Sequence, residues 1–170
     1  VWFMGGDINA NNLKDLGSTI WKEWQNNEGS IGPMYGAAWR GKHGLKTDQL
    51  AEAIRLIKND PMSRRILVNA WVPELLPDPA YSPIENVDQG KMALAPCHVQ
   101  YQFYVSTSGT LNLTWYQRSW DVCLGGGFNI ASYAALLHIV AFLTDLKPGR
   151  IHVSVGDAHL YADHINEGHV

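Results

Sequence analysis

Three segments in the second half of the chain decide its fold: HVQYQFYV at residues 98–105, TLNLTWYQ at residues 110–117, and IASYAALLHIVAFL at residues 130–143. Apolar and polar residues alternate in the first two segments, which is typical of strands. Ser108-Gly109 lies between them and predicts a turn, so we expect an antiparallel hairpin. The third segment is almost entirely apolar and predicts a helix that is buried on most sides.

Two further segments, residues 65–71 and 151–155, also predict strands. Strands that meet in hairpins beside one long helix are typical of an α+β domain. Residues 73–90 contain four prolines and little periodicity, and they predict a surface loop. No repeat or internal boundary is visible, so we expect one domain over residues 1–170. Its apolar start and the polar motif near its end indicate that the sequence is incomplete at both termini.

The first half of the chain predicts shorter elements. Apolar residues between Leu13 and Trp24 recur at near-helical spacing, but Gly17 interrupts them, which predicts two short helices. Residues 47–57 predict a longer helix, with Thr47 as the N-terminal cap and an end before Pro61.

Composition excludes several classes of function. The chain has 170 residues, of which 46% are hydrophobic and 17% charged, so it is expected to fold around a core. A net charge of -3 argues against a nucleic-acid partner. Two cysteines form neither a disulfide framework nor a zinc pattern, and no run predicts a membrane span or a secretory signal. We therefore expect a cytoplasmic protein without membrane association, in which a few placed arginines bind anions.

Two polar motifs carry the candidate chemistry. APCH at residues 95–98 puts the Cys97 thiol beside a proline and the His98 imidazole, and QRSWD at residues 117–121 packs an amide, a guanidinium, a hydroxyl and a carboxylate together. An isolated cysteine is most often inert packing, as we interpret Cys123, and a polar pentapeptide is often a surface loop. Together the motifs predict a site that holds a nucleotide phosphate and attacks its base. A nearby arginine can stabilise the reactive thiolate form of Cys97, because the ordinary pKa of a cysteine thiol is roughly 8.5.

Other polar residues have two readings each. Ser63-Arg64-Arg65 is either a solvated turn or a grip on a phosphate. Adjacent arginines at the start of a strand would point to opposite faces, which suggests that one of them reaches another subunit. Asn129 precedes the long helix and is most simply its N-cap, although its amide also matches the N3–H and O4 edge of uracil.

The last motif, GDAHLY at residues 156–161, contains His159 and Tyr161, which alternate on an extended segment and so face the same side. They suit a sugar hydroxyl. No metal site is predicted, because the histidines of this region lack ligand spacing: His152, His159, His164 and His169.

These motifs resemble the thymidylate synthase family over nearly the whole chain. The matching segments are TIWKEW (19–24), GPMYG (32–36), WR (39–40), DQ (48–49), SRR (63–65), MALAPCH (92–98), WYQRS (115–119), FNIASYA (128–134) and GDAHLY (156–161). The resemblance implies a mixed β-sheet packed against helices, with sheets that pair across a homodimer. It implies a methyltransferase that converts dUMP to dTMP, with 5,10-methylenetetrahydrofolate as co-substrate and no metal.

The resemblance also implies residue roles. Cys97 would attack C6 of the uracil ring, and the other catalytic residues would be Tyr35, His98, Asp121 and Asn129. The nucleotide would be held by Gln117, Arg118, Ser119, Asp121, Asn129, His159 and Tyr161, with Arg64 and Arg65 supplied by the partner subunit. The folate would contact Ile20, Trp21, Trp24, Leu94, Asp121, Leu124, Gly125 and Phe128.

Three departures from the family pattern leave alternatives open. Gly127 replaces the usual proline in a triple glycine, which predicts a looser loop, and the connection between Trp71 and Lys91 is long. A glutamate and an arginine that the family carries before Trp2, and its C-terminal tail, are not visible. A dUMP hydroxymethylase would share the nucleophile and phosphate site, whereas a deoxycytidylate hydroxymethylase fits Asn129 less well. A non-catalytic nucleotide- or RNA-binding relative is the alternative of another class.

Overall fold

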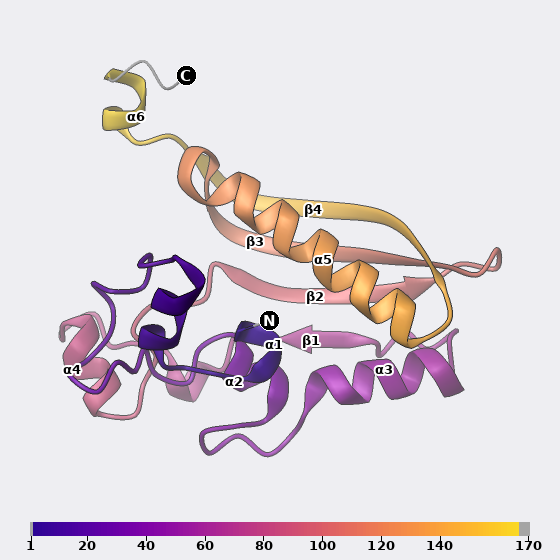
Figure 1. The fold of residues 1–170 in the computed structure, drawn as a ribbon, viewed down its shortest axis with the longest axis horizontal. Coiled ribbons are helices and arrows are strands. Elements are labelled where there is room, and N and C mark those ends of the chain that lie inside the picture. Colours follow the sequence, from indigo (N-terminus) through magenta and orange to yellow (C-terminus); the bar gives the residue numbers. More distant parts are fainter. Residues whose placement is uncertain (1, 167–170) are drawn as a thin grey trace. The chain divides into compact units, whose positions relative to one another are not determined.

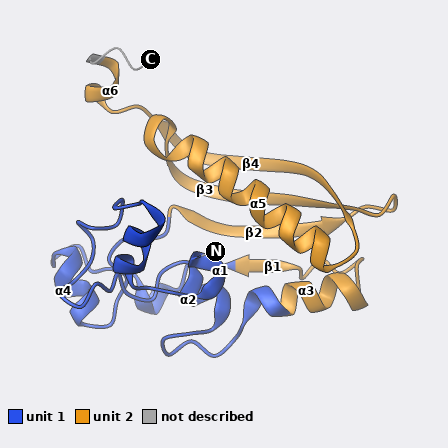
Figure 2. Cartoon of the chain, viewed as in Figure 1, with its two compact units in different colours: residues 1–51, 69–96 blue, residues 52–68, 97–170 orange. Residues whose placement is uncertain are grey.

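In the computed structural model, which describes residues 2–166, helices and a four-stranded mixed sheet give the α+β class expected from the sequence (Figure 1). The elements are α1 (Trp2–Gly5), η1 (Ala10–Leu16), α2 (Gly36–Arg40), α3 (Gln49–Asn59), β1 (Leu67–Asn69), η2 (Pro73–Leu75), α4 (Pro83–Asp88), β2 (His98–Val105), β3 (Thr110–Asp121), η3 (Val122–Gly126), α5 (Gly127–Leu143), β4 (Lys147–His159) and α6 (Ala162–Asn166). The chain divides into two compact units, residues 1–51 with 69–96 and residues 52–68 with 97–170 (Figure 2). The single domain over residues 1–170 stays a prediction.

The sheet has the strand order β1-β2-β3-β4. β2 and β3 pair antiparallel, with Phe103 opposite Leu113, which confirms the expected hairpin and its turn at Ser108-Gly109. β3 and β4 pair in parallel, with Trp115 opposite Val153. β3 and β4 are both longer than the sequence predicts, whereas the strand expected at residues 65–71 is limited to β1.

α5 lies along the sheet of the second unit (Figure 1). Only one stripe of its side chains is buried. The buried residues of α5 recur at helical spacing: Tyr133, Leu136, Leu137, Val140 and Ala141. Across from them, alternate residues of the strands are buried, among them Tyr101, Phe103, Leu111, Leu113 and Trp115. Each such large apolar side chain contributes roughly 1.5–3 kcal/mol when fully buried.

The expectation that this helix is buried on most sides is wrong. Phe128 is 75% exposed and Phe142 81% exposed, because only one stripe of the helix faces the sheet. η3 and α5 together form an apolar stretch, Val122–Leu143, that is long enough to cross a membrane by length and composition. The prediction that no apolar run is long enough to span a membrane is therefore wrong by length and composition. Core helices of globular proteins meet the same criterion.

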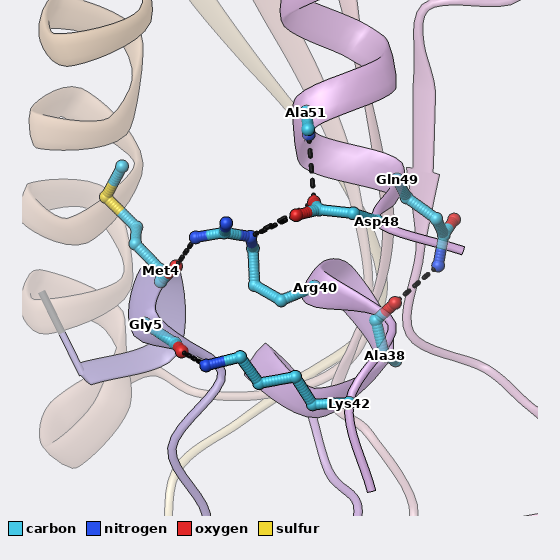
Figure 3. Close-up of polar contacts among 8 residues, drawn as sticks. All are labelled: Met4, Gly5, Ala38, Arg40, Lys42, Asp48, Gln49 and Ala51. Carbon is cyan, nitrogen blue, oxygen red and sulfur yellow. Dashed lines mark hydrogen bonds and ion pairs between the residues drawn. The ribbon is translucent and has the colours of Figure 1, made fainter. Parts of the chain in front are cut away.

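Polar contacts hold the helices of the first unit together (Figure 3). The Arg40 guanidinium forms an ion pair with the Asp48 carboxylate at 2.9 Å and also donates to the Met4 carbonyl. The Gln49 amide donates to the Ala38 carbonyl at 2.8 Å. The Lys42 ammonium donates to the carbonyl of the last residue of α1 at 2.6 Å. These contacts connect α1, α2 and the start of α3.

Two local expectations for the first unit need correction. The Ala51 N–H donates to the Asp48 carboxylate at 3.0 Å, so Asp48 and not Thr47 caps α3. Only one regular element, the 3-10 helix η1, forms between Leu13 and Trp24, and turns follow the left-handed Gly17.

Residues 73–90 are also more ordered than the predicted surface loop. They contain η2 and α4, and α4 begins with a reciprocal capping box between Ser82 and Glu85. Asn86 is only 1% exposed, and its side chain bonds the backbone of Asp78 in both directions. Two of the four prolines, Pro73 and Pro83, therefore start helices here and do not exclude them.

Candidate active site

The two polar motifs meet across the β2–β3 pair. The Arg118 N–H donates to the Cys97 carbonyl at 2.9 Å, and His98 lies opposite Gln117. The register of the pair shifts between His98 and Gln100, which marks a bulge beside the cysteine. Bulges re-aim side chains at the ends of paired strands. The half-buried Cys97 thus lies beside the strand that carries the guanidinium and hydroxyl of Arg118 and Ser119.

A hydrogen-bonded network extends from β3 through α5 to His98. Gln117 is 2% exposed; its Oε1 accepts from Trp115 Nε1 at 3.1 Å, and its Nε2 donates to the Ser119 carbonyl at 2.9 Å. The same nitrogen lies 3.3 Å from Asn129 Oδ1. Asn129 Nδ2 lies 3.0 Å from His98 Nε2, and His98 Nδ1 lies 3.3 Å from the Tyr133 hydroxyl. The network joins the amide predicted to read the base to the imidazole beside the thiol.

Burial lowers the pKa of His98 from 6.5 to about 4, because the charged imidazole is poorly solvated there. His98 is therefore neutral at neutral pH. A neutral imidazole has one donor and one acceptor nitrogen, which matches its two partners in the network.

The interpretation of Asn129 as a helix cap is wrong. α5 begins at Gly127 and has no side-chain cap, so Asn129 already lies inside the first turn. Its amide bonds Gln117 and His98. Gly125 and Gly126 belong to the π-helical η3, and Gly127 is the first residue of α5, so the predicted loose loop is a helix start.

A second polar group surrounds the end of β4. His159 Nδ1 lies 2.7 Å from Asp157 Oδ1, and the rings of His159 and Tyr161 lie 5.3 Å apart, which confirms that these two residues face the same side. Tyr161 also contacts the ring of His164, whose Nδ1 lies 4.0 Å from Asp121 Oδ1. The same Asp121 oxygen accepts from the N–H groups of the second and third residues of η3, at 3.0 Å each, so this carboxylate has a structural role as well.

The two adjacent arginines are not arranged as the sequence predicts. Arg64 and Arg65 lie in a turn before β1, not in a strand, and both line one cavity of about 760 Å³. Arg55 and Glu52, which form an ion pair at 2.7 Å, line it too. The prediction that these two guanidinium groups point to opposite faces is therefore wrong.

The predicted folate contacts fall into both units. In the first unit, Ile20 is 61% exposed, Trp24 and Leu94 are half-buried, and the Trp21 ring lies 6.1 Å from that of Tyr35. Tyr35 has φ of +30°, a conformation that side chains rarely adopt and that often marks functional positions.

In the second unit, the apolar side chains of Leu124 and Phe128 are exposed, at 59% and 75%. Cys123 is exposed too, so its interpretation as a packing residue is wrong.

Some residues of this region were not selected from the sequence. Trp115 and Tyr133 belong to the network, and Asp157 and His164 belong to the group at the end of β4. Trp115 could have been selected from the sequence, because it lies two residues from Gln117 on the same strand and so shares the face of Gln117. Within residues 2–166 there is no group of three or more potential metal ligands. His169 lies outside the described residues.

Comparisons with known proteins agree with these motifs. A family model described as thymidylate synthase matches residues 1–169. A curated protein named thymidylate synthase, from Francisella philomiragia subsp. philomiragia, is 46% identical over 167 residues. The aligned region covers 98% of this chain and 61% of that protein, so the chain spans less than two thirds of the relative's length.

Proposed function

Because the chain belongs to the thymidylate synthase family, we propose that it forms the nucleotide-binding and nucleophilic part of an enzyme that converts dUMP to dTMP. The observation that carries the proposal is the backbone pairing of Cys97 with Arg118, beside the network of His98, Gln117 and Asn129. A thiol, an anion-binding guanidinium and a pyrimidine-reading amide are the groups that this chemistry requires.

Cys97 has the role of nucleophile in this proposal. C5 of uracil is a poor nucleophile, but addition of the Cys97 thiolate to C6 makes C5 enolate-like, and C5 can then attack an electrophilic one-carbon unit. Arg118 and Ser119 bind the phosphate as a charge-assisted pair. His159 and Tyr161, whose rings contact each other edge to face, bind the ribose hydroxyl.

Asn129 reads the base and stabilises the charge that develops on O4. Its amide carries one more N–H and one more lone pair than the bonds to His98 and Gln117 use, so it can donate to O4 and accept from N3–H. A donor fixed in place before the reaction stabilises developing charge without reorganisation. His98 supports this role as a neutral acceptor for Asn129.

5,10-Methylenetetrahydrofolate would supply the one-carbon unit and the hydride. In the first unit, the half-buried Trp21 offers a flat apolar surface that suits a fused ring, and its ring lies 6.1 Å from that of the buried Tyr35; Ile20, Trp24 and Leu94 are further contacts. In the second unit, exposed Phe128 and Leu124 offer apolar surface close in sequence to Asp121 and Gly125. The role of Tyr35 rests on the family resemblance, which implies that this residue helps to remove the C5 proton.

We further propose a homodimer in which Arg64 and Arg65 bind the phosphate held by the partner subunit. The sheet supports pairing, because Tyr104 and Tyr116 are 60% and 39% exposed on strands whose alternate residues pack against α5. Mixing Cys97→Ser protein with Arg65→Ala protein should then restore activity, since one hybrid site has all its residues. A monomer in light scattering would contradict the proposal.

The product of the purified protein tests the reaction. With dUMP and 5,10-methylenetetrahydrofolate we expect dTMP and dihydrofolate, no product from Cys97→Ser, and full activity from Cys123→Ser, which alters the other, exposed cysteine. 5-Hydroxymethyl-dUMP in place of dTMP would assign the hydroxymethylase alternative. Binding of dUMP without any turnover would assign the non-catalytic one.

A further inference from the structure

One buried indole N–H stands at the start of the network that ends at His98. Trp115 is 1% exposed, and its Nε1 donates to Gln117 Oε1 at 3.1 Å. An indole nitrogen can only donate, so the atom of Gln117 that faces it is the oxygen. The Ser119 carbonyl can only accept, so the atom of Gln117 that faces it, at 2.9 Å, is the nitrogen. Two independent neighbours thus fix the orientation of one amide.

This orientation determines every later member of the network. Gln117 Nε2 donates to Asn129, so the facing atom of Asn129 is its oxygen and its nitrogen faces His98. His98 Nε2 accepts from that nitrogen, and the imidazole proton is on Nδ1, 3.3 Å from the Tyr133 hydroxyl. Without such constraints, an amide flipped by 180° would offer a pyrimidine the opposite donor and acceptor pattern, which suits cytosine.

We propose that Trp115 is a positioning residue for pyrimidine selectivity, and that its N–H sets the orientation of the Asn129 amide through Gln117. The inference rests on the proposed function of Asn129 as the residue that reads the base. Flipping Gln117 breaks its contacts with both Trp115 and Ser119, whereas without the indole N–H only the contact with Ser119 opposes the flip.

Trp115→Phe tests the role, because phenylalanine keeps an aromatic ring against Tyr133, on which Trp115 stacks at 4.5 Å, and removes the N–H. The matched control is Trp120→Phe, since among the described residues the buried Trp120 Nε1 has no hydrogen-bond partner. Calorimetry gives the Kd for dUMP and for dCMP. We expect the preference for dUMP to fall roughly threefold to tenfold in Trp115→Phe, the equivalent of about one hydrogen bond, and to stay unchanged in Trp120→Phe.

A second measurement separates orientation from packing. ¹⁵N spectra of the ligand-free protein report the His98 tautomer, which we expect to be Nδ1–H in the wild type and mixed with Nε2–H in Trp115→Phe. If that variant does not fold, a benzothienylalanine at position 115 replaces the N–H by sulfur at nearly the same shape. An unchanged preference together with an unchanged His98 tautomer would overturn the inference, as would an equal loss of preference in Trp120→Phe.

The binding assay needs no folate, so the two proposals can fail separately. A protein that binds dUMP in preference to dCMP without methylating it would contradict the proposed reaction. The role of Trp115 would then still be decided by the nucleotide preference and the His98 tautomer of Trp115→Phe. A wild type that binds neither nucleotide would contradict both.

Discussion

The most direct consequence of the network for stability is a dependence on pH that comes from His98. Its pKa is about 4 in the folded protein and 6.5 in an unfolded chain, so the unfolded state binds more protons between these values. Stability that is present above pH 6.5 is therefore lost as the pH falls toward 4. The gap between the two pKa values corresponds to roughly 3 kcal/mol of unfolding free energy.

The test compares the wild type with His98→Gln. A glutamine can accept from Asn129 with its oxygen and donate to Tyr133 with its nitrogen, so it keeps the polarity of both bonds and does not titrate. The assay is urea unfolding between pH 4 and 7.5 at constant ionic strength. We expect the wild type to lose roughly 3 kcal/mol more than the variant over this interval.

His138→Gln is the matched control, because His138 is an exposed histidine of α5 outside this network. Its pH dependence should follow that of the wild type. If His98→Gln lost as much unfolding free energy as the wild type between pH 6.5 and 4, then His98 would not be a buried neutral imidazole. The assignment of its proton to Nδ1 would be refuted as well.

Four further substitutions at single positions have predicted outcomes. Gly127→Ala should raise the unfolding free energy by roughly 0.5–1 kcal/mol, because φ of Gly127 is -62° and an added Cβ meets nothing within 4 Å. Gly32→Ala should lower the unfolding free energy, since φ of Gly32 is +74° and an added Cβ would collide with the Lys91 carbonyl. Ser82→Ala should cost about 1 kcal/mol in urea unfolding, because it removes the cap of α4. Asn129→Asp should shift the ratio of kcat/KM toward dCMP by about ten- to a hundredfold, since a carboxylate cannot donate to O4; an unchanged ratio would show that Asn129 does not read the base.

The central part of the fold could be predicted from the sequence because its periodicity is local. The alternation in residues 98–105 and 110–117 predicts the β2–β3 hairpin, and the apolar run after residue 130 predicts α5. Periodicity does not show what each face of a helix or strand packs against. α5 is apolar all round, so its exposed side, with Phe128 and Phe142, could not be recognised from the sequence.

The residue types of the candidate site could be predicted from the sequence, whereas their arrangement in space could not. The motifs selected Cys97 and Arg118, but their contact depends on a bulge that no sequence pattern marks. Arg64 and Arg65 were assigned to a strand because Ile66 and the residues after it are strand-like, whereas the turn extends through both arginines. For Asn129, its position relative to the helix start decides whether it caps the helix or bonds Gln117 and His98, and that start lies three residues earlier than the apolar run suggests.

The proposed reaction depends on one covalent bond, between the Cys97 sulfur and C6 of the pyrimidine. The most direct measurement is mass spectrometry of the protein after incubation with 5-fluoro-dUMP and 5,10-methylenetetrahydrofolate, because fluorine at C5 blocks the later loss of a proton and traps the adduct. We expect a stable adduct on the peptide that contains Cys97, no adduct in Cys97→Ser, and unchanged dUMP binding by that variant. An adduct that forms normally in Cys97→Ser, or on Cys123, would contradict this expectation.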